Sequence, residues 1–173
     1  ASLEKAVEGC EIIITTANAV APRKKADSFK SVDIKGYQDL ITAAHKAEVN
    51  QFIYTSALPF SGKLNHWIPL SGAKLKTEAF LKGSGMNYTI IQPDAFMDVY
   101  FAFMGSSLPV KDEPAPLVNR PWKFMQNFYN GVKNDIENGQ IDMVGDGQVK
   151  HSFIAIENVA DFLVKSVAHP DML

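Results

Sequence analysis

The chain has 173 residues, with 46% hydrophobic and 21% charged residues, as in ordinary globular domains. Its formal net charge of −2 gives no broad positive surface of the kind that binds nucleic acid or an anionic membrane. A single cysteine excludes an internal disulfide and a metal site built from several cysteines. No stretch approaches the roughly 20 apolar residues of a membrane span, and no signal-peptide pattern is present, so we expect a cytoplasmic location without membrane contact.

The first elements in chain order are a short helix and a buried strand. Leu3, Ala6 and Val7 have helical spacing, and Gly9 follows as a stop. The β-branched run at 11–16 predicts a strand buried on both faces. Because the chain starts inside a helical pattern without Met and stops just after another, we expect it to be part of a longer protein.

Two further strands follow, each entered from a helix. A stripe of apolar and small residues over 32–47 predicts a helix before the strand 51–56. A loop at 57–70 contains His66 and Trp67. Ser71 is the expected N-cap of a helix over 71–82, which leads to the strand 87–92.

The rest of the chain predicts a smaller lobe and a returning helix. Residues 95–130 are rich in aromatic residues and interrupted by prolines, with one helix expected at 123–129. Short strands are expected at 141–144 and 152–156, and an amphipathic helix over 157–168 with Val159, Phe162, Leu163 and Val167 inward. The expected organisation is a main portion at 1–94, a small lobe over most of 95–157, and a helix at 158–168 that returns to the core.

Alternating buried strands and helices predict an α/β fold in which 11–16, 51–56 and 87–92 are neighbouring parallel strands. Ligands of such open sheets bind outside the carboxyl ends of the strands. The chemistry is therefore expected near Ser56, Pro93 and Asp94. The carboxylates Asp142 and Asp146 lack further ligands nearby in the sequence, so no metal site is expected.

Several segments, in order, resemble the NmrA-like branch of the atypical short-chain dehydrogenase/reductases. They are Val32-Asp33 with Gly36 and Ala43-Ala44, Phe52-Ile-Tyr-Thr-Ser-Ala57, Lys74 and Glu78 with Ser84-Gly85, Tyr88-Thr-Ile-Ile-Gln-Pro93 with Phe96-Met97, Val144-Gly-Asp-Gly147, and Phe153-Ile154 with Asn158-Val-Ala-Asp161. The resemblance covers nearly the whole chain. It implies a partial Rossmann-like parallel sheet flanked by helices, a small substrate-facing C-terminal lobe, and NAD(P) as cofactor, with NADP(H) favoured.

Two features depart from that family pattern. The chain contains no G-x-G-x-x-G or G-x-x-G-x-x-G turn, which in such folds cradles the pyrophosphate on a helix N-terminus. The resemblance implies that the chain begins just before the fourth strand of the family fold, so that it forms only part of the cofactor site. Leu70 stands four residues before Lys74, where typical short-chain dehydrogenases carry the catalytic tyrosine.

The resemblance also implies site residues. Lys74 would bind the nicotinamide ribose, although a solvent-exposed partner of Glu78 is the alternative. Ser56 would orient a substrate or simply cap its strand, and His66 is a further candidate donor to substrate or an ordinary surface residue. The other cofactor-binding candidates follow the first and third strands: Ala17, Asn18, Pro93, Asp94, Ala95 and Phe96.

Two functional hypotheses remain open. The first, narrowly favoured, is an NAD(P)-dependent oxidoreductase acting on a small apolar carbonyl, quinone or phenolic compound, with Lys74, Ser56 and His66 as the catalytic candidates. The second is a non-catalytic NAD(P)-binding redox sensor or regulatory scaffold, which Leu70 favours because leucine cannot act as a general acid. The expected partner is a small-molecule ligand; the oligomeric state stays open.

Overall fold

The computed structural model describes residues 2–20, 24–60, 64–100, 130–131, 133–140, 146–148 and 150–169. The chain divides into two compact units, one formed by Ala1–Pro93 with Glu157–Leu173 and the other by Asp94–Ile156. The helix expected at 123–129 and the strand expected at 141–144 lie outside the described residues.

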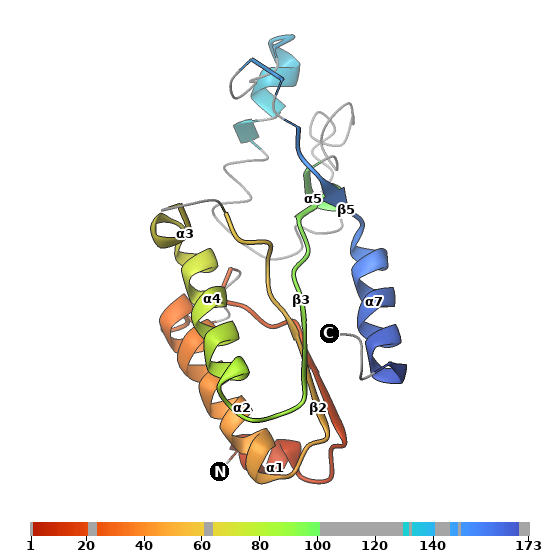
Figure 1. Ribbon diagram of the computed structural model, residues 1–173. Coiled ribbons are helices and arrows are strands. Elements are labelled where there is room, and N and C mark those ends of the chain that lie inside the picture. Colours follow the sequence, from red (N-terminus) through yellow and green to blue (C-terminus); the bar gives the residue numbers. More distant parts are fainter. Residues whose placement is uncertain are drawn as a thin grey trace. The chain divides into compact units, whose positions relative to one another are not determined.

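The first unit is built on a parallel sheet in the order β1-β2-β3, as the buried strand patterns predict (Figure 1). The strands are β1 (Ile12–Thr15), β2 (Gln51–Thr55) and β3 (Tyr88–Ile91). Ile13 pairs with Phe52, and Phe52 with Tyr88, so the three strands run in register and end at one edge. The expected α/β fold class is therefore confirmed.

Helices connect the strands across one face of the sheet (Figure 1). The helix α1 (Ser2–Val7) precedes β1. Between β1 and β2 the chain forms η1 (Phe29–Gly36), a π-helix that continues directly into α2 (Tyr37–Lys46). A capping box between Ser28 and Ser31 begins η1. The helices α3 (Leu64–Trp67) and α4 (Pro69–Lys82) connect β2 to β3.

The start of α4 differs from the expectation. Ile68 is its N-cap residue and Pro69 its first helical residue, so the prediction that Ser71 caps this helix is wrong. Proline is favoured at this position because its φ angle is already helical and its missing N–H has no intrahelical partner to lose. Ser71 instead lies buried within the first turn and donates a hydrogen bond to Oδ1 of Asn65 at 2.6 Å.

The core lies between the sheet and α2 and α4. Its buried members are Tyr37, Ile41, Ala44, Val49, Phe52, Tyr54 and Leu81. Alternate residues of each strand face this layer, because successive side chains of a strand point to opposite faces. The centre of the fold thus contains two tyrosines, whose rings meet edge to face at 4.9 Å between centroids.

The other face of the sheet contacts α7 (Ile156–Ala168). Nε2 of Gln51 donates hydrogen bonds to the Ser166 carbonyl and to Oγ1 of Thr89, both at 3.1 Å. Val159, Leu163 and Ser166 are the buried residues of this helix. Val159 and Leu163 face inward as predicted, but the same prediction for Phe162 and Val167 is wrong, because these residues are 52% and 37% exposed. They lie on either side of the narrow stripe that the three buried residues form along the helix.

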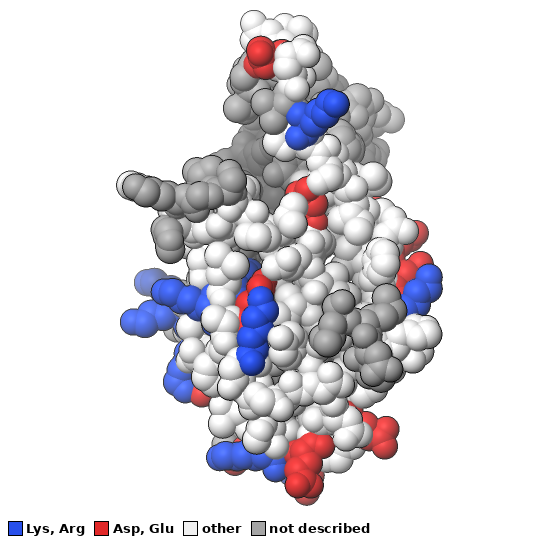
Figure 2. All heavy atoms as spheres, in the orientation of Figure 1, with Lys and Arg blue, Asp and Glu red and all other residues white. Residues whose placement is uncertain are grey.

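The second unit contains β4 (Ala95–Phe96) and β5 (Phe153–Ile154), which pair in parallel, and α5 (Met97–Tyr100). The backbone N–H of Ile156 donates to Oδ2 of Asp98 at 2.7 Å. On the face shown in Figure 2, the charged side chains of both signs are interspersed. None of the helices in the described part of the chain is long and apolar enough to cross a bilayer.

Candidate functional site

The carboxyl ends of β1, β2 and β3 lie at one edge of the sheet, where open α/β folds bind their ligands. The N–H of Ser56 donates to the Ile91 carbonyl at 2.8 Å, and the N–H of Leu58 donates to the Pro93 carbonyl at 2.9 Å. These bonds continue the pairing of β2 and β3 into the loops beyond them. The candidate site is therefore a connected edge.

Lys74 reaches this edge from α4, but inside the fold. Its side chain is buried, with the residue 5% exposed, and Nζ donates to the Thr55 carbonyl at 2.8 Å. The ammonium also lies 4.9 Å from the ring centroid of Tyr54 and 5.8 Å from that of Tyr37, where the negative ring faces attract a cation. Lys74 is thus not the solvent-exposed partner of Glu78 that its spacing allowed.

Two carboxylates compensate this buried charge. Burial lowers the pKa of Lys74, while the negative charges of Asp33 and Glu78 act in the opposite direction. Asp33 is fully buried, and that burial raises the pKa of its carboxyl, against the opposing effects of the Ala19 N–H and of Lys74. The charges beneath the edge therefore form one interacting group.

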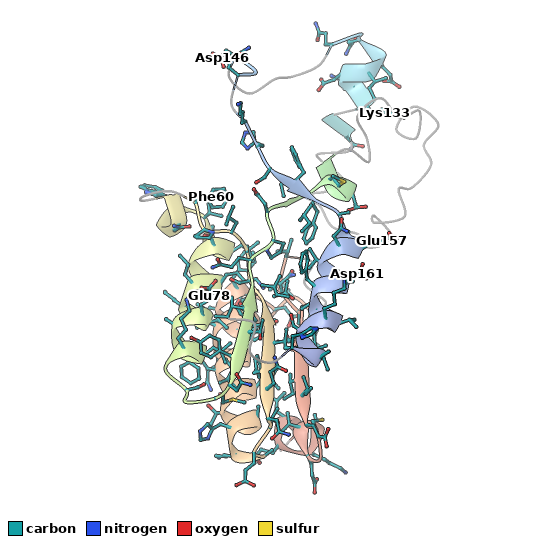
Figure 3. The ribbon with its side chains drawn as sticks, turned by 45° about the vertical axis from the view of Figure 1, so that its right-hand side comes forward. Phe60, Glu78, Lys133, Asp146, Glu157 and Asp161 are labelled. Atoms are coloured by element: carbon teal, nitrogen blue, oxygen red, sulfur yellow. The ribbon has the colours of Figure 1, made fainter. Side chains whose placement is uncertain are left out.

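Glu78 binds the ends of two strands together. Its Oε1 accepts hydrogen bonds from Oγ of Ser56 at 2.5 Å and from Nε2 of Gln92 at 2.8 Å, and its Oε2 accepts one from Nζ of Lys82 at 3.2 Å. Figure 3 labels Glu78 on α4. Because the Ser56 hydroxyl has a single proton and donates it to the carboxylate, its oxygen can only accept a further hydrogen bond.

The loop that follows β1 is held from beneath by two buried residues. The hydroxyl of Tyr37 donates to the Ala17 carbonyl at 2.6 Å, and Oδ2 of Asp33 accepts the N–H of Ala19 at 2.8 Å. Burial raises the pKa of Tyr37 to about 12, so the hydroxyl keeps its proton at neutral pH. Ala17 and Asn18, both predicted to meet a cofactor, are exposed.

Asp33 and Tyr37 were not among the predicted site residues, although a signal exists. They lie four residues apart in a segment with helical patterning, so one helical face carries both. A carboxylate and a tyrosine together on an otherwise apolar face must find polar partners once that face is buried. Their partners, Ala17 and Ala19, lie in a distant loop.

The remaining predicted residues are divided between the units. Pro93 belongs to the first unit, whereas Asp94, Ala95 and Phe96 belong to the second. Hydrogen bonds from the Ser152 hydroxyl and from the Ala95 N–H lower the pKa of Asp94. His66 lies in α3, and its side chain is outside the described part. Among the described residues, no group of three or more His, Cys, Asp or Glu side chains could hold a metal ion.

The groups at this edge can be compared with the chemistry of a dinucleotide. Ala17 and Asn18 are exposed beside the strand ends, and the oxygen of Ser56, a residue that is 4% exposed, can accept a further hydrogen bond. A pyrophosphate needs several convergent backbone N–H groups, which a Gly-rich turn supplies and this sequence lacks. Of the parts of such a cofactor, the groups present have chemistry suited to a sugar hydroxyl and not to a pyrophosphate.

Comparison with known proteins identifies the family of the chain. Residues 1–111 match the family model described as NAD(P)H-binding. The chain is 37% identical over 91 residues to the photosystem II assembly factor Ycf39 of Cyanophora paradoxa, which covers 53% of this chain and 27% of that protein. It is 31% identical over 96 residues to the Synechocystis sp. protein of the same name, covering 56% of this chain and 28% of the other.

Among solved structures, a putative NAD-dependent epimerase/dehydratase from Bacillus halodurans is similar with a TM-score of 0.47 and 26% identity, covering 54% of this chain and 44% of that one. The matched segment spans little more than a quarter of the length of the two curated relatives. The family model covers well over half of the residues and includes all three strands of the first unit. The chain therefore belongs to the NAD(P)H-binding family.

Proposed function

We propose that this chain forms the ribose-facing part of an NAD(P) site in a regulatory or assembly protein that binds the dinucleotide without ordinary carbonyl reduction. One observation carries the proposal: the single hydroxyl proton of Ser56 is used inside the fold, and Lys74 is buried there. Ser56 donates to Glu78 at 2.5 Å, and Lys74 donates to the Thr55 carbonyl at 2.8 Å. Leu70 occupies the position that a catalytic tyrosine would hold.

General acid catalysis needs a side chain that gives its proton to the reacting oxygen and later regains it. The Ser56 proton lies between two oxygens at the end of β2, and the residue is 4% exposed. The similarity to assembly factors from Cyanophora paradoxa and Synechocystis sp. supports a role in holding a protein partner. A bound nicotinamide would supply hydride chemistry, and these residues would orient the attached ribose.

The test uses the full-length protein and calorimetric titration with NADH and NADPH. We expect one of them to bind and no turnover of a panel of quinones, aldehydes and enones. Turnover that falls in Ser56→Ala or His66→Ala, with unchanged dinucleotide affinity, would instead establish an oxidoreductase. Absence of binding to either dinucleotide would overturn both hypotheses.

A further inference from the structure

The loop Ala17–Ala19 is fixed on its inner side by side chains from η1 and α2. The Ala17 carbonyl accepts from the Tyr37 hydroxyl at 2.6 Å, and the Ala19 N–H donates to Asp33 at 2.8 Å. Tyr37 is 3% exposed and Asp33 is fully buried, so both groups lie beneath the loop. Oδ1 of Asn18 accepts the N–H of Val20 at 3.0 Å and fixes the local turn.

These bonds determine how the two peptide groups on either side of Asn18 are oriented. In a trans peptide the carbonyl and the next N–H point in opposite directions. The Ala17 carbonyl points to Tyr37, so the Asn18 N–H points away from it. The Ala19 N–H points to Asp33, so the Asn18 carbonyl points away as well. Asn18 is exposed and therefore presents one backbone donor and one backbone acceptor at the carboxyl edge of the sheet.

The direction of the hydrogen-bond chain is also determined. The hydroxyl of Tyr37 lies 2.7 Å from Oγ1 of Thr15, and its own proton is given to Ala17. Thr15 must therefore donate to Tyr37. Because Thr15 is the last residue of β1, the loop is tied to the strand and to α2 at the same point.

Asp33 is held in turn by its surroundings. The hydroxyl of Thr77 on α4 donates to the Asp33 carbonyl at 2.5 Å, which fastens this turn of the π-helix. The ammonium of Lys74 supplies an attractive positive charge to the buried carboxylate. A charged acceptor makes a stronger bond to a backbone N–H than a neutral one. Lys74 thus supports the loop from below.

We propose that Asp33 and Tyr37 are positioning residues that turn the backbone N–H and carbonyl of Asn18 toward the dinucleotide, where the pair matches the neighbouring hydroxyls of a ribose. The proposal rests on the proposed function, since it requires a bound dinucleotide. A ribose diol both donates and accepts hydrogen bonds, as this backbone pair does. Lys74 then contributes to binding through Asp33.

The first comparison is between Tyr37→Phe and Tyr54→Phe in the full-length protein. Both keep the core ring, but only the Tyr37 hydroxyl bonds the loop, whereas the Tyr54 hydroxyl interacts with Thr77 on α4. We expect Tyr37→Phe to weaken NADPH or NADH binding about fivefold, the usual worth of one neutral hydrogen bond. Tyr54→Phe should leave affinity unchanged.

Hydrogen exchange separates positioning from general stability. Added dinucleotide should protect amides of the segment 16–20 in the wild type and in Tyr54→Phe, and protect them less in Tyr37→Phe. A second pair of variants is Asp33→Asn and the surface control Asp39→Asn, since the Asp39 carboxylate pairs with the exposed Lys35. We expect Asp33→Asn to weaken dinucleotide binding and to reduce the protection of 16–20, and Asp39→Asn to change neither.

Two outcomes would overturn the positioning role of Asp33 and Tyr37. If the wild type binds a dinucleotide but the segment 16–20 gains no protection, or if Tyr37→Phe behaves like Tyr54→Phe, the positioning role is overturned while dinucleotide binding stands. If the wild type binds neither NADH nor NADPH, the proposed function is overturned and the positioning role with it.

Discussion

Replacing Glu78 with alanine should destabilise the protein more than the loss of any surface carboxylate. Glu78 is 3% exposed and accepts hydrogen bonds from Ser56, Gln92 and Lys82. Ser56 is itself buried, so its hydroxyl loses its partner, at a cost of about 1–3 kcal/mol. The bond from the more exposed Gln92 adds about 0.5–1 kcal/mol.

The exposed ion pair contributes little to this total. The Lys82 side chain is 53% exposed, and such pairs are worth at most about 1 kcal/mol. Loss of the one buried methylene that alanine does not keep, Cγ of Glu78, adds about 0.8 kcal/mol. Allowing for non-additive contributions, we expect Glu78→Ala to lower the free energy of unfolding by about 3 kcal/mol, a large share of the 5–15 kcal/mol typical of domains.

Urea unfolding of the full-length protein, followed by circular dichroism, measures this change. Glu78→Gln keeps one acceptor oxygen and should lose about 1–2 kcal/mol. Glu4→Ala is the matched control, because that side chain is 64% exposed and its oxygen lies 3.7 Å from Nζ of Lys46. If Glu78→Ala falls within about 0.5 kcal/mol of Glu4→Ala, Glu78 does not hold the strand ends together.

Three further predictions use the same unfolding assay. Lys74→Met should lower the free energy of unfolding by about 1–3 kcal/mol, because it leaves the buried Asp33 without its positive neighbour. The control Lys76→Met, at an exposed position, should lower it by less than about 0.5 kcal/mol, and equal effects of the two substitutions would contradict the prediction. Burial raises the pKa of Asp33 above 3.8, so over some pH range the folded state keeps a proton that the unfolded chain has released. The free energy of unfolding of the wild type should therefore fall, relative to that of Asp33→Asn, as the pH rises from about 4. A difference between the two proteins that does not change with pH would refute this prediction. Leu81→Ala should cost about 2–5 kcal/mol because Leu81 is fully buried, and Phe80→Ala, at a 37% exposed neighbour, distinctly less.

The strands could be predicted closely because burial on both faces leaves a continuous apolar run. The predicted ranges 11–16, 51–56 and 87–92 each exceed the observed strand by one or two residues. Helix boundaries depend on local chemistry, and the predicted start of α4 was wrong. Serine is a favourable N-cap residue, but Pro69 starts the helix two residues before Ser71.

The partners of the site residues could not be predicted, because they are set by tertiary packing. Lys74 and Glu78 have the spacing of a surface ion pair on a helix, and the sequence does not show that this face of α4 meets the strand ends. The bond from Lys74 to Thr55 and the bond from Ser56 to Glu78 both connect α4 to the end of β2. Which acceptor each donor meets is determined by how α4 packs against the end of β2.

The distribution of buried polar groups is the physical reason why we propose binding rather than catalysis. A catalytic donor must exchange its hydrogen-bond partner during each turnover. A buried polar group that loses its partner is destabilised, because neither water nor another protein group replaces the lost hydrogen bond. Ser56, Lys74, Asp33 and Tyr37 all bond groups that fix the strand ends or the loop after β1. Moving any one of them would release part of that edge. The backbone of Asn18, in contrast, can meet a ligand without breaking any of these bonds. We therefore expect a ligand that is held by the fixed backbone of this edge rather than one that draws protons from the side chains beneath it.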